Sequence, residues 1–168
     1  ALVSENIARH LKASFLDRPK NWKPLIYCWR GGDRSGSMTT VFKAIGWHAG
    51  QLDGGYKAWR GHVIARLAEL PPQFRFIVVC GATGNAKTRI LQAIDGLGEQ
   101  VLDLETLACH KGSVLGVLPD QPQPSQKAFE TALLQALSRF DPARPVYVEA
   151  ESRKIANLHV PEALSERI

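Results

Sequence analysis

The stretch FRFIVVCGATGNAKTRI, residues 74–90, decides the fold of the chain. Its first seven residues are apolar or β-branched apart from one arginine, and they predict a buried strand over 74–80. A glycine-bearing loop follows, and a helical pattern begins at about residue 87. A strand, a glycine-rich loop and a helix in this order form the context that a phosphate-binding loop, or P-loop, requires.

The residues of this loop have distinct expected roles. Backbone amides would surround a phosphate, Lys87 would neutralise its charge, and the Thr88 hydroxyl is suited to ligating Mg²⁺. Ala86 stands where the motif expects glycine, and its Cβ is tolerable only at a negative φ. A chance glycine-rich turn before a helix is the alternative interpretation. The candidate phosphate-binding residues are Gly81, Thr83, Gly84, Asn85, Lys87 and Thr88.

Strands alternate with helices on both sides of this stretch, which predicts an α/β fold with parallel sheets. Pro71 and Pro72 form the clearest break in the chain, so we expect one domain over residues 1–70 and another over 74–168. The expected helices cover 4–15, 37–45, 87–94 and 125–138, with a further helical stretch that ends at Leu70, and the expected strands cover 25–27, 47–53, 74–80, 101–104 and 146–149.

Composition limits the function classes. Hydrophobic residues make up 45% of the 168 residues and charged residues 22%, which excludes a disordered tail or a fibrous repeat. The net charge of +5 permits a polyanionic partner such as RNA but does not demonstrate one. No apolar run approaches the roughly 20 residues that span a bilayer, so no membrane partner is expected. Three cysteines, an odd number, favour a reducing, cytoplasmic setting with a free thiol.

The segment CWRGGDRS, residues 28–35, is a second candidate site. A cysteine at the end of a strand, followed by a glycine-rich loop and a helix, places backbone N–H groups around its sulfur. The helix N-terminus and two arginines would lower the pKa of the thiol and stabilise the nucleophilic thiolate. A buried structural cysteine before a turn is the alternative. The candidate catalytic residue is Cys28, and the anion-cradle residues are Trp29, Arg30, Gly31, Gly32, Arg34 and Ser35.

The C-x5-R spacing from Cys28 to Arg34 resembles the active loop of rhodanese-family sulfurtransferases and of the phosphatases built on the same fold. The loop is one residue longer than in most sulfur-transferring rhodaneses, so the spacing leaves phosphatase activity open. GGYKAW, residues 54–59, is similar to the segment that follows this loop in rhodanese domains. The expected fold class is therefore the C-terminal part of a rhodanese-like α/β domain, followed by a P-loop NTPase-like parallel sheet with flanking helices.

A thiol loop and a P-loop in tandem resemble the tRNA 2-selenouridine synthases, a bacterial family that joins a rhodanese domain to a P-loop domain. The matching segments occur in the order of the family and cover nearly the whole chain. They are YCWRGGDRS (27–35), GGYKAWR (54–60), CGATGNAKT (80–88), DLETLACHKGSVLG (103–116), QPSQKAFE (123–130) and VEAESRKIANLHVP (148–161).

The resemblance implies an enzyme that replaces the sulfur of the wobble 2-thiouridine of tRNA by selenium. Its co-substrates would be selenophosphate and geranyl diphosphate, with an S-geranylated intermediate, and Cys28 would be the essential thiol. The P-loop domain would bind a nucleotide or the prenyl diphosphate, with Mg²⁺ as a further ligand. The implied partners are tRNA and a selenophosphate-supplying enzyme. No zinc or haem site is expected, since no cysteine and histidine spacing indicates one.

Two further segments fit a ligand site at the ends of the later strands, where doubly wound sheets place their ligands. Lys111 stands where the family more often has arginine, which keeps the charge but loses a bidentate grip on phosphate. Ala150 replaces a usual aspartate, and Ala156 replaces a usual glycine. The alternative for each charged residue is a solvated loop position. The candidate residues are His110, Lys111, Ser113, Glu149, Glu151, Ser152 and Arg153.

Two other function classes remain open at this point. One is a rhodanese-type sulfurtransferase or C-x5-R phosphatase with an appended nucleotide-binding regulatory module. The other is a non-enzymatic module whose altered loops only bind ligands. Only 27 residues precede Cys28, so we also expect an internal fragment: an N-terminally truncated rhodanese-like domain and a C-terminally truncated P-loop domain.

Overall fold

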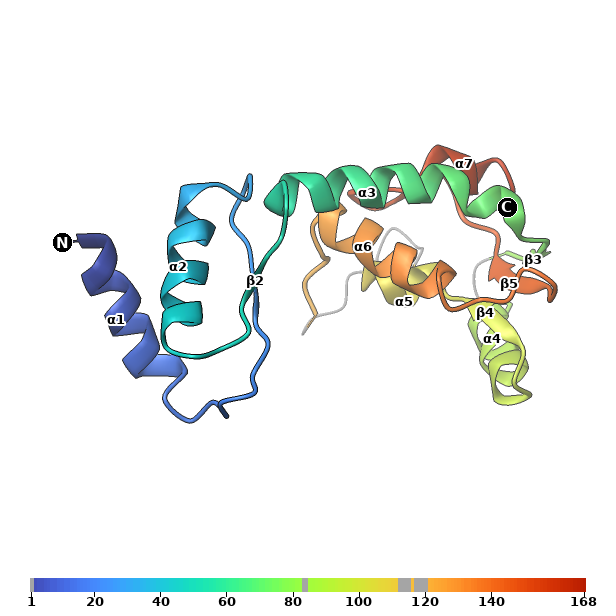
Figure 1. Ribbon diagram of the computed structural model, residues 1–168. Helices are drawn as coiled ribbons and strands as arrows, with labels where there is room; N and C mark the ends of the chain where they lie inside the picture. The colour runs from blue at the N-terminus through green and yellow to red at the C-terminus, as the bar shows by residue number, and fades with distance from the viewer. Residues whose placement is uncertain (1, 83–84, 112–115, 117–120) are drawn as a thin grey trace. The chain divides into compact units, whose positions relative to one another are not determined.

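The computed structural model describes residues 2–82, 85–111, 116 and 121–168 (Figure 1). The chain forms two compact units, Ala1–Gly61 and His62–Ile168. Their boundary lies inside the helix α3, Gly55–Glu69, and so precedes the expected boundary at 70–73. The reason is packing, because Val63 and Leu67 of α3 are buried in the core of the second unit.

The first unit pairs two short parallel strands with two helices. They are α1 (Leu2–Ser14), β1 (Leu25–Ile26), α2 (Asp33–Ala44) and β2 (Gly50–Gln51). Leu25 pairs with Gly50 in the parallel register. The helix α2 begins at Asp33, four residues before the expected start, so Ser35 lies in its first turn. The rhodanese likeness of this unit stays a prediction.

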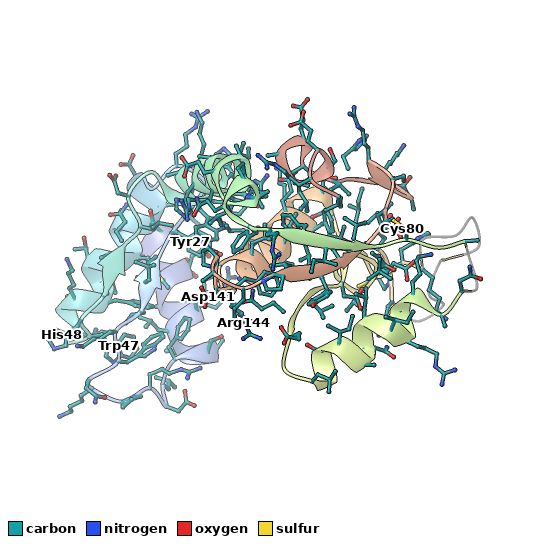
Figure 2. All side chains as sticks on the ribbon, turned by 90° about the vertical axis from the view of Figure 1, so that its right-hand side faces the viewer. Tyr27, Trp47, His48, Cys80, Asp141 and Arg144 are labelled. Carbon is teal, nitrogen blue, oxygen red and sulfur yellow. The ribbon has the colours of Figure 1, made fainter. Side chains whose placement is uncertain are left out.

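An aromatic cluster forms the interior of the first unit. The rings of Phe15 and Trp22 stack with their centroids 5.4 Å apart. Trp47 meets Trp22 edge-on at 5.1 Å and Phe42 edge-on at 5.0 Å. Phe42 is 2% exposed, so these edge-to-face contacts shield the buried face of α2 from water. Trp47, labelled in Figure 2, therefore has a packing role in this unit.

The second unit is built on a parallel sheet of three strands in the order β3-β5-β4. β5 is central, pairing Val79 of β3 with its own Glu149. The parallel α/β prediction is thus confirmed for this unit. After α3 its elements are η1 (Pro71–Gln73), β3 (Phe76–Val79), α4 (Lys87–Gly96), β4 (Gln100–Leu102), α5 (Leu104–Ala108), α6 (Gln126–Leu137), β5 (Val146–Glu149), β6 (Lys154–Ile155), β7 (Leu158–His159) and α7 (Glu162–Ser165).

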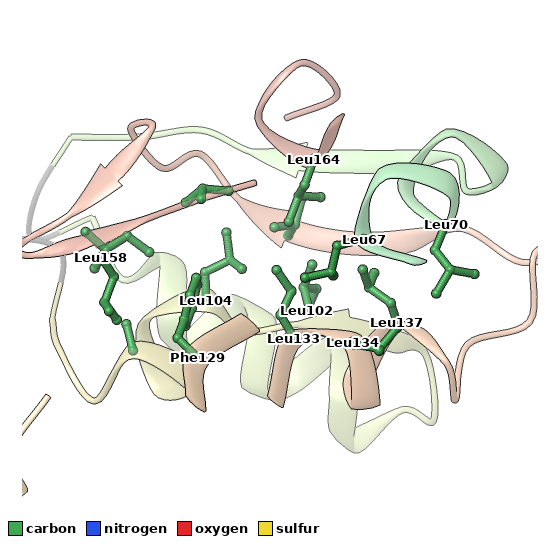
Figure 3. Packing of buried hydrophobic residues seen from close by; sticks show 14 of the residues in the cluster. Leu67, Leu70, Leu102, Leu104, Phe129, Leu133, Leu134, Leu137, Leu158 and Leu164 are labelled. Atoms are coloured by element: carbon green, nitrogen blue, oxygen red, sulfur yellow. The ribbon is translucent and has the colours of Figure 1, made fainter. Parts of the chain in front are cut away.

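The core of the second unit lies between the sheet and its helices. Figure 3 shows Leu67 of α3 and Leu133 and Leu137 of α6 pointing into one cluster. Leu133 and Leu137 are fully buried, as is Leu164 of α7. This packing fixes the three strands so that their carboxyl ends meet at one edge, where ligands bind in such sheets. In the described part of the chain, every helix is too short or too polar to cross a bilayer.

Candidate functional site

The thiol loop, residues 28–35, connects β1 to α2 and holds Cys28 against the first turn of α2. The N-cap of this helix is Gly32, so the backbone N–H groups that follow lack partners within the helix. The Ser35 hydroxyl lies 3.2 Å from the Cys28 sulfur, in hydrogen-bonding geometry. The early start of α2 therefore brings both the hydroxyl and the backbone N–H of Ser35 to the thiol.

These hydrogen bonds lower the pKa of Cys28 from 9.0 to about 6. The largest contribution comes from the Ser35 hydroxyl, followed by the backbone N–H of Ser35, while burial acts in the opposite direction. The backbone N–H groups of Arg30 and Gly32 contribute further. The lowered pKa agrees with the prediction of a thiolate, but its origin differs. Hydrogen-bond donors of the loop produce the shift, whereas the prediction also invoked the arginine charges.

Gln51 of β2 is a candidate functional residue that the sequence analysis missed. Its side-chain amide donates to the Ser35 hydroxyl over 2.9 Å and to the carbonyls of Gly31 and Gly32. Because the hydroxyl oxygen accepts from Gln51, its proton is left for the thiolate of Cys28 or the Gly32 carbonyl. A polar side chain at the end of the strand expected over 47–53 was the signal that could have revealed it.

The GGYKAW segment, residues 54–59, supports the thiol loop through backbone hydrogen bonds. The backbone N–H groups of Tyr56 and Lys57 donate to the carbonyls of Cys28 and Trp29, each over 2.9 Å. Gly55 has a φ of +59°, and a Cβ at this position would overlap the Cys28 carbonyl oxygen. Only glycine combines this conformation with so close an approach. The start of α3 thus binds the carbonyls of the loop.

A cavity of about 330 Å³ opens beside the sulfur of Cys28. The ring of Trp29 lies 5.3 Å from that of Tyr56, and Trp29 is 48% exposed. An anion would meet the side chains of two arginines in this wall. The residues that line the cavity are Cys28, Trp29, Arg30, Gly32, Asp33 and Arg34. All are predicted members of the site except Asp33.

The phosphate loop, residues 81–88, joins β3 to α4. Cys80, labelled in Figure 2, follows the end of β3 and is exposed. Lys87 begins α4, and its ammonium group donates to the Gly81 carbonyl over 2.8 Å, which closes the loop. Ala86 has a φ of +57°, the unfavourable case for a residue with a Cβ. Thr83 and Gly84 lie outside the described residues.

A second cavity, of about 1020 Å³, joins the phosphate loop to the carboxyl edge of the sheet. Most of the predicted residues line it, so the structure brings two separately predicted segments into one site. Arg153 is exposed and does not line the cavity, and Ser113 lies outside the described residues. The predicted residues in the wall are Gly81, Asn85, Lys87, Thr88, His110, Lys111, Glu149, Glu151 and Ser152.

Carboxylates dominate the deep wall of this cavity. Glu149 is 1% exposed, and burial together with the charge of Glu105 raises its pKa from 4.5 to about 7. Burial also raises the pKa of Glu151, with Glu105 as the second cause. Oxygens of these three residues lie within 4.8 Å of one another. Thr88 and the carboxylates supply hard oxygen donors, so the residues present fit Mg²⁺.

Glu105 is a second candidate functional residue that the sequence analysis missed. It lies on α5, which directly follows β4, and it reaches Glu149 and Glu151 across the edge of the sheet. The side chain of Asp103, the N-cap of α5, is instead used within the helix end, where it accepts from the backbone and hydroxyl of Thr106. The signal that could have revealed it is its position, because Glu105 directly follows the strand expected over 101–104.

Comparison with known proteins assigns the chain to a family. A family model described as the tRNA 2-selenouridine synthase AAA domain matches residues 74–168. The chain belongs to the tRNA 2-selenouridine synthase family. The matched region begins two residues before β3 and contains every described residue that lines the larger cavity, so the family assignment and the geometry concern the same residues.

Relatives named tRNA 2-selenouridine synthase extend the similarity into the first unit. One from Alcanivorax borkumensis is 39% identical over 145 residues, covering 85% of the chain and 39% of the relative. One from Nitrosomonas europaea is 35% identical over 166 residues, 96% of the chain and 43% of the relative. The chain thus spans about two fifths of the length of the curated relatives it matches. No solved structure matches the chain.

Two alanines of the chain stand where the family resemblance leads us to expect glycine, and both have a positive φ. Ala86 ends the phosphate loop at +57°, and Ala156 begins the two-residue turn between β6 and β7 at +49°. Hairpin turns of two residues favour glycine at such a position. The backbone conformation of each turn is therefore kept, and the alanine side chain strains it.

Proposed function

We propose that this protein modifies tRNA, replacing the sulfur of the wobble 2-thiouridine by selenium. Family membership supports the reaction class, since the relatives are named for 2-selenouridine synthesis on tRNA. The observation that carries the proposal is the pair of sites in one chain, a thiolate cradle at Cys28 and a phosphate loop closed by Lys87. Selenium delivery and diphosphate binding each require one of them.

The larger cavity is the proposed site for geranyl diphosphate. Lys87 and Lys111 in its wall supply positive charge toward a diphosphate, and the start of α4 faces the same space. In the proposed first step the thiocarbonyl sulfur attacks the allylic carbon, the carbon–oxygen bond breaks and diphosphate leaves. Charge that develops on the leaving diphosphate is what these cationic groups would stabilise.

Mg²⁺ is the ion expected beside that diphosphate. Thr88 and the carboxylates of Glu149 and Glu151 are the residues that would hold it. When bound, the ion would supply charge neutralisation to the phosphate oxygens. Lys87 has a separate role in the proposal, since its ammonium group can turn from the Gly81 carbonyl toward a bound phosphate.

The thiol-loop cavity is the proposed site for selenophosphate. Its arginines, Arg30 and Arg34, present donors suited to a phosphate-like anion, and Cys28 is the essential thiol of the proposal. Geranylation turns the sulfur of the nucleoside into a better leaving group. Selenium then attacks C2, geranyl thiol leaves, and water cleaves the selenium–phosphorus bond to release phosphate.

The test is tRNA selenation by the protein expressed from its complete gene. With 2-thiouridine tRNA, selenophosphate and geranyl diphosphate, mass spectrometry of the nucleosides should detect 2-selenouridine. Cys28→Ser should abolish it, and Cys80→Ser, which removes an exposed thiol outside both cavities, should retain it. Turnover of thiosulfate or an aryl phosphate with unchanged tRNA would instead establish the sulfurtransferase or phosphatase alternative.

A further inference from the structure

Three carboxylates converge at the carboxyl edge of the sheet. Glu149 ends β5, Glu151 follows it, and Glu105 comes from α5 after β4. Each offers an oxygen within 4.8 Å of the other two. Three acidic groups at such distances repel one another unless a cation or a proton compensates for them. They come from two segments that only the parallel pairing of β4 with β5 brings together.

A second observation comes from buried polar atoms in the same cavity. Glu149 is 1% exposed, yet its Oε1 has no hydrogen-bond partner among the described residues. His110 is 6% exposed, and its Nδ1 also lacks a partner within the described parts of the chain. Both residues line the larger cavity. Buried polar atoms without partners are rare in folded proteins and indicate a missing ion or water.

Two charged groups near these atoms, Lys87 and Asp103, already have hydrogen-bond partners. The Lys87 ammonium donates to the Gly81 carbonyl. The carboxylate of Asp103, which also acts electrostatically on Glu149, accepts from Thr106. A hydrated cation could provide partners for both unpaired atoms, Glu149 Oε1 and His110 Nδ1. It would bind the carboxylate oxygens directly, and its waters could reach His110.

We propose that Glu105, Glu149 and Glu151 form a site for a hard divalent cation, Mg²⁺ or Mn²⁺, that fills without nucleotide or diphosphate. All-oxygen donors select this class of ion over zinc. An ion held at Thr88 alone would arrive with a phosphate, because a neutral hydroxyl gives it little affinity. The three carboxylates instead supply the charge within the protein, so the ion is in place before a phosphate-bearing ligand enters.

The experiment uses Mn²⁺ alone as the probe, since its free form has a strong paramagnetic resonance signal. The protein expressed from its complete gene is treated with chelator, exchanged into buffer and titrated with no phosphate compound present. We expect one Mn²⁺ bound per chain. Glu105→Gln should weaken binding at least tenfold.

A matched variant and a second readout separate loss of the site from loss of the fold. Glu166→Gln removes an exposed carboxylate that is not part of the cluster, and it should bind Mn²⁺ like the parent protein. Mn²⁺ should raise the melting temperature of the parent protein but not of Glu105→Gln. Binding that requires added diphosphate, or that survives Glu105→Gln, would overturn the proposal.

Discussion

The thiol loop and the phosphate loop share one plan but depend on different sources of order. In both, a strand leads into a glycine-bearing loop and a helix, at Cys28 and at Gly81. The thiol loop is braced by neighbours, Gln51 and the start of α3, whereas the phosphate loop is closed by its own Lys87. Because their supports differ, we expect mutations to affect the two loops differently.

Gly55→Ala, which changes the support of the thiol loop by α3, should have the largest effect on the free energy of unfolding. The new methyl group would overlap the Cys28 carbonyl at a φ of +59°, so we expect a loss of about 3 kcal/mol of stability. Gly61→Ala, at a helical position with open space around it, should stabilise by up to about 1 kcal/mol. Thermal unfolding of both variants measures the difference. Equal effects would show that α3 does not support the thiol loop.

Glu149→Gln, in the cavity beside the phosphate loop, should have the second-largest effect, and it should stabilise the metal-free protein. The folded pKa of Glu149, about 7, lies above the ordinary 4.5, so the folded state retains a proton that the unfolded state loses. Stability relative to the variant should therefore fall as the pH rises from about 4.5 to 7. At pH 7.5 with chelator present, we expect the variant to gain about 1–3 kcal/mol. A pH-independent difference between the two would contradict the shifted pKa.

Ser35→Ala should reduce the reactivity of the thiol. Alkylation of Cys28, followed on its peptide by mass spectrometry, should have a midpoint near pH 6 in the parent protein. Without the Ser35 hydroxyl, we expect the midpoint to rise by one or two pH units and the rate at pH 7 to fall about tenfold. Thr40→Ala, which removes another hydroxyl of α2, is the matched control. An unchanged midpoint would transfer the effect to the backbone donors.

The smallest effects should follow from replacing strained alanines by glycine. Ala86→Gly and Ala156→Gly relieve positive φ values and should each stabilise by up to about 1 kcal/mol. Ala93→Gly, in the helix α4, should instead cost about 1 kcal/mol. Chemical denaturation measures all three. A loss of stability in the first two variants would show that these turns tolerate a Cβ without strain.

Local sequence patterns predicted the two strand–loop–helix motifs well, because each motif lies in one continuous segment of the chain. The same patterns led to the thiol at Cys28 and to Lys87. Gln51 and Glu105 were not predicted as site residues, because parallel strand pairing between distant segments is what brings them to the two sites. The boundary between the compact units lies before the expected 70–73 for a related reason. The first residues of α3 donate hydrogen bonds to the thiol loop, whereas its later residues are buried in the core of the second unit.

We propose two chemically distinct sites in this chain, a thiolate at Cys28 and a phosphate site at Lys87, and calorimetric titration with geranyl diphosphate in Mg²⁺ tests this division directly. Lys87→Ala should weaken binding at least tenfold, because the residue closes the phosphate loop and lines its cavity. Cys28→Ser should bind like the parent protein. Failure of the parent protein to bind, or equal losses in both variants, would contradict a diphosphate site at Lys87 that is separate from Cys28.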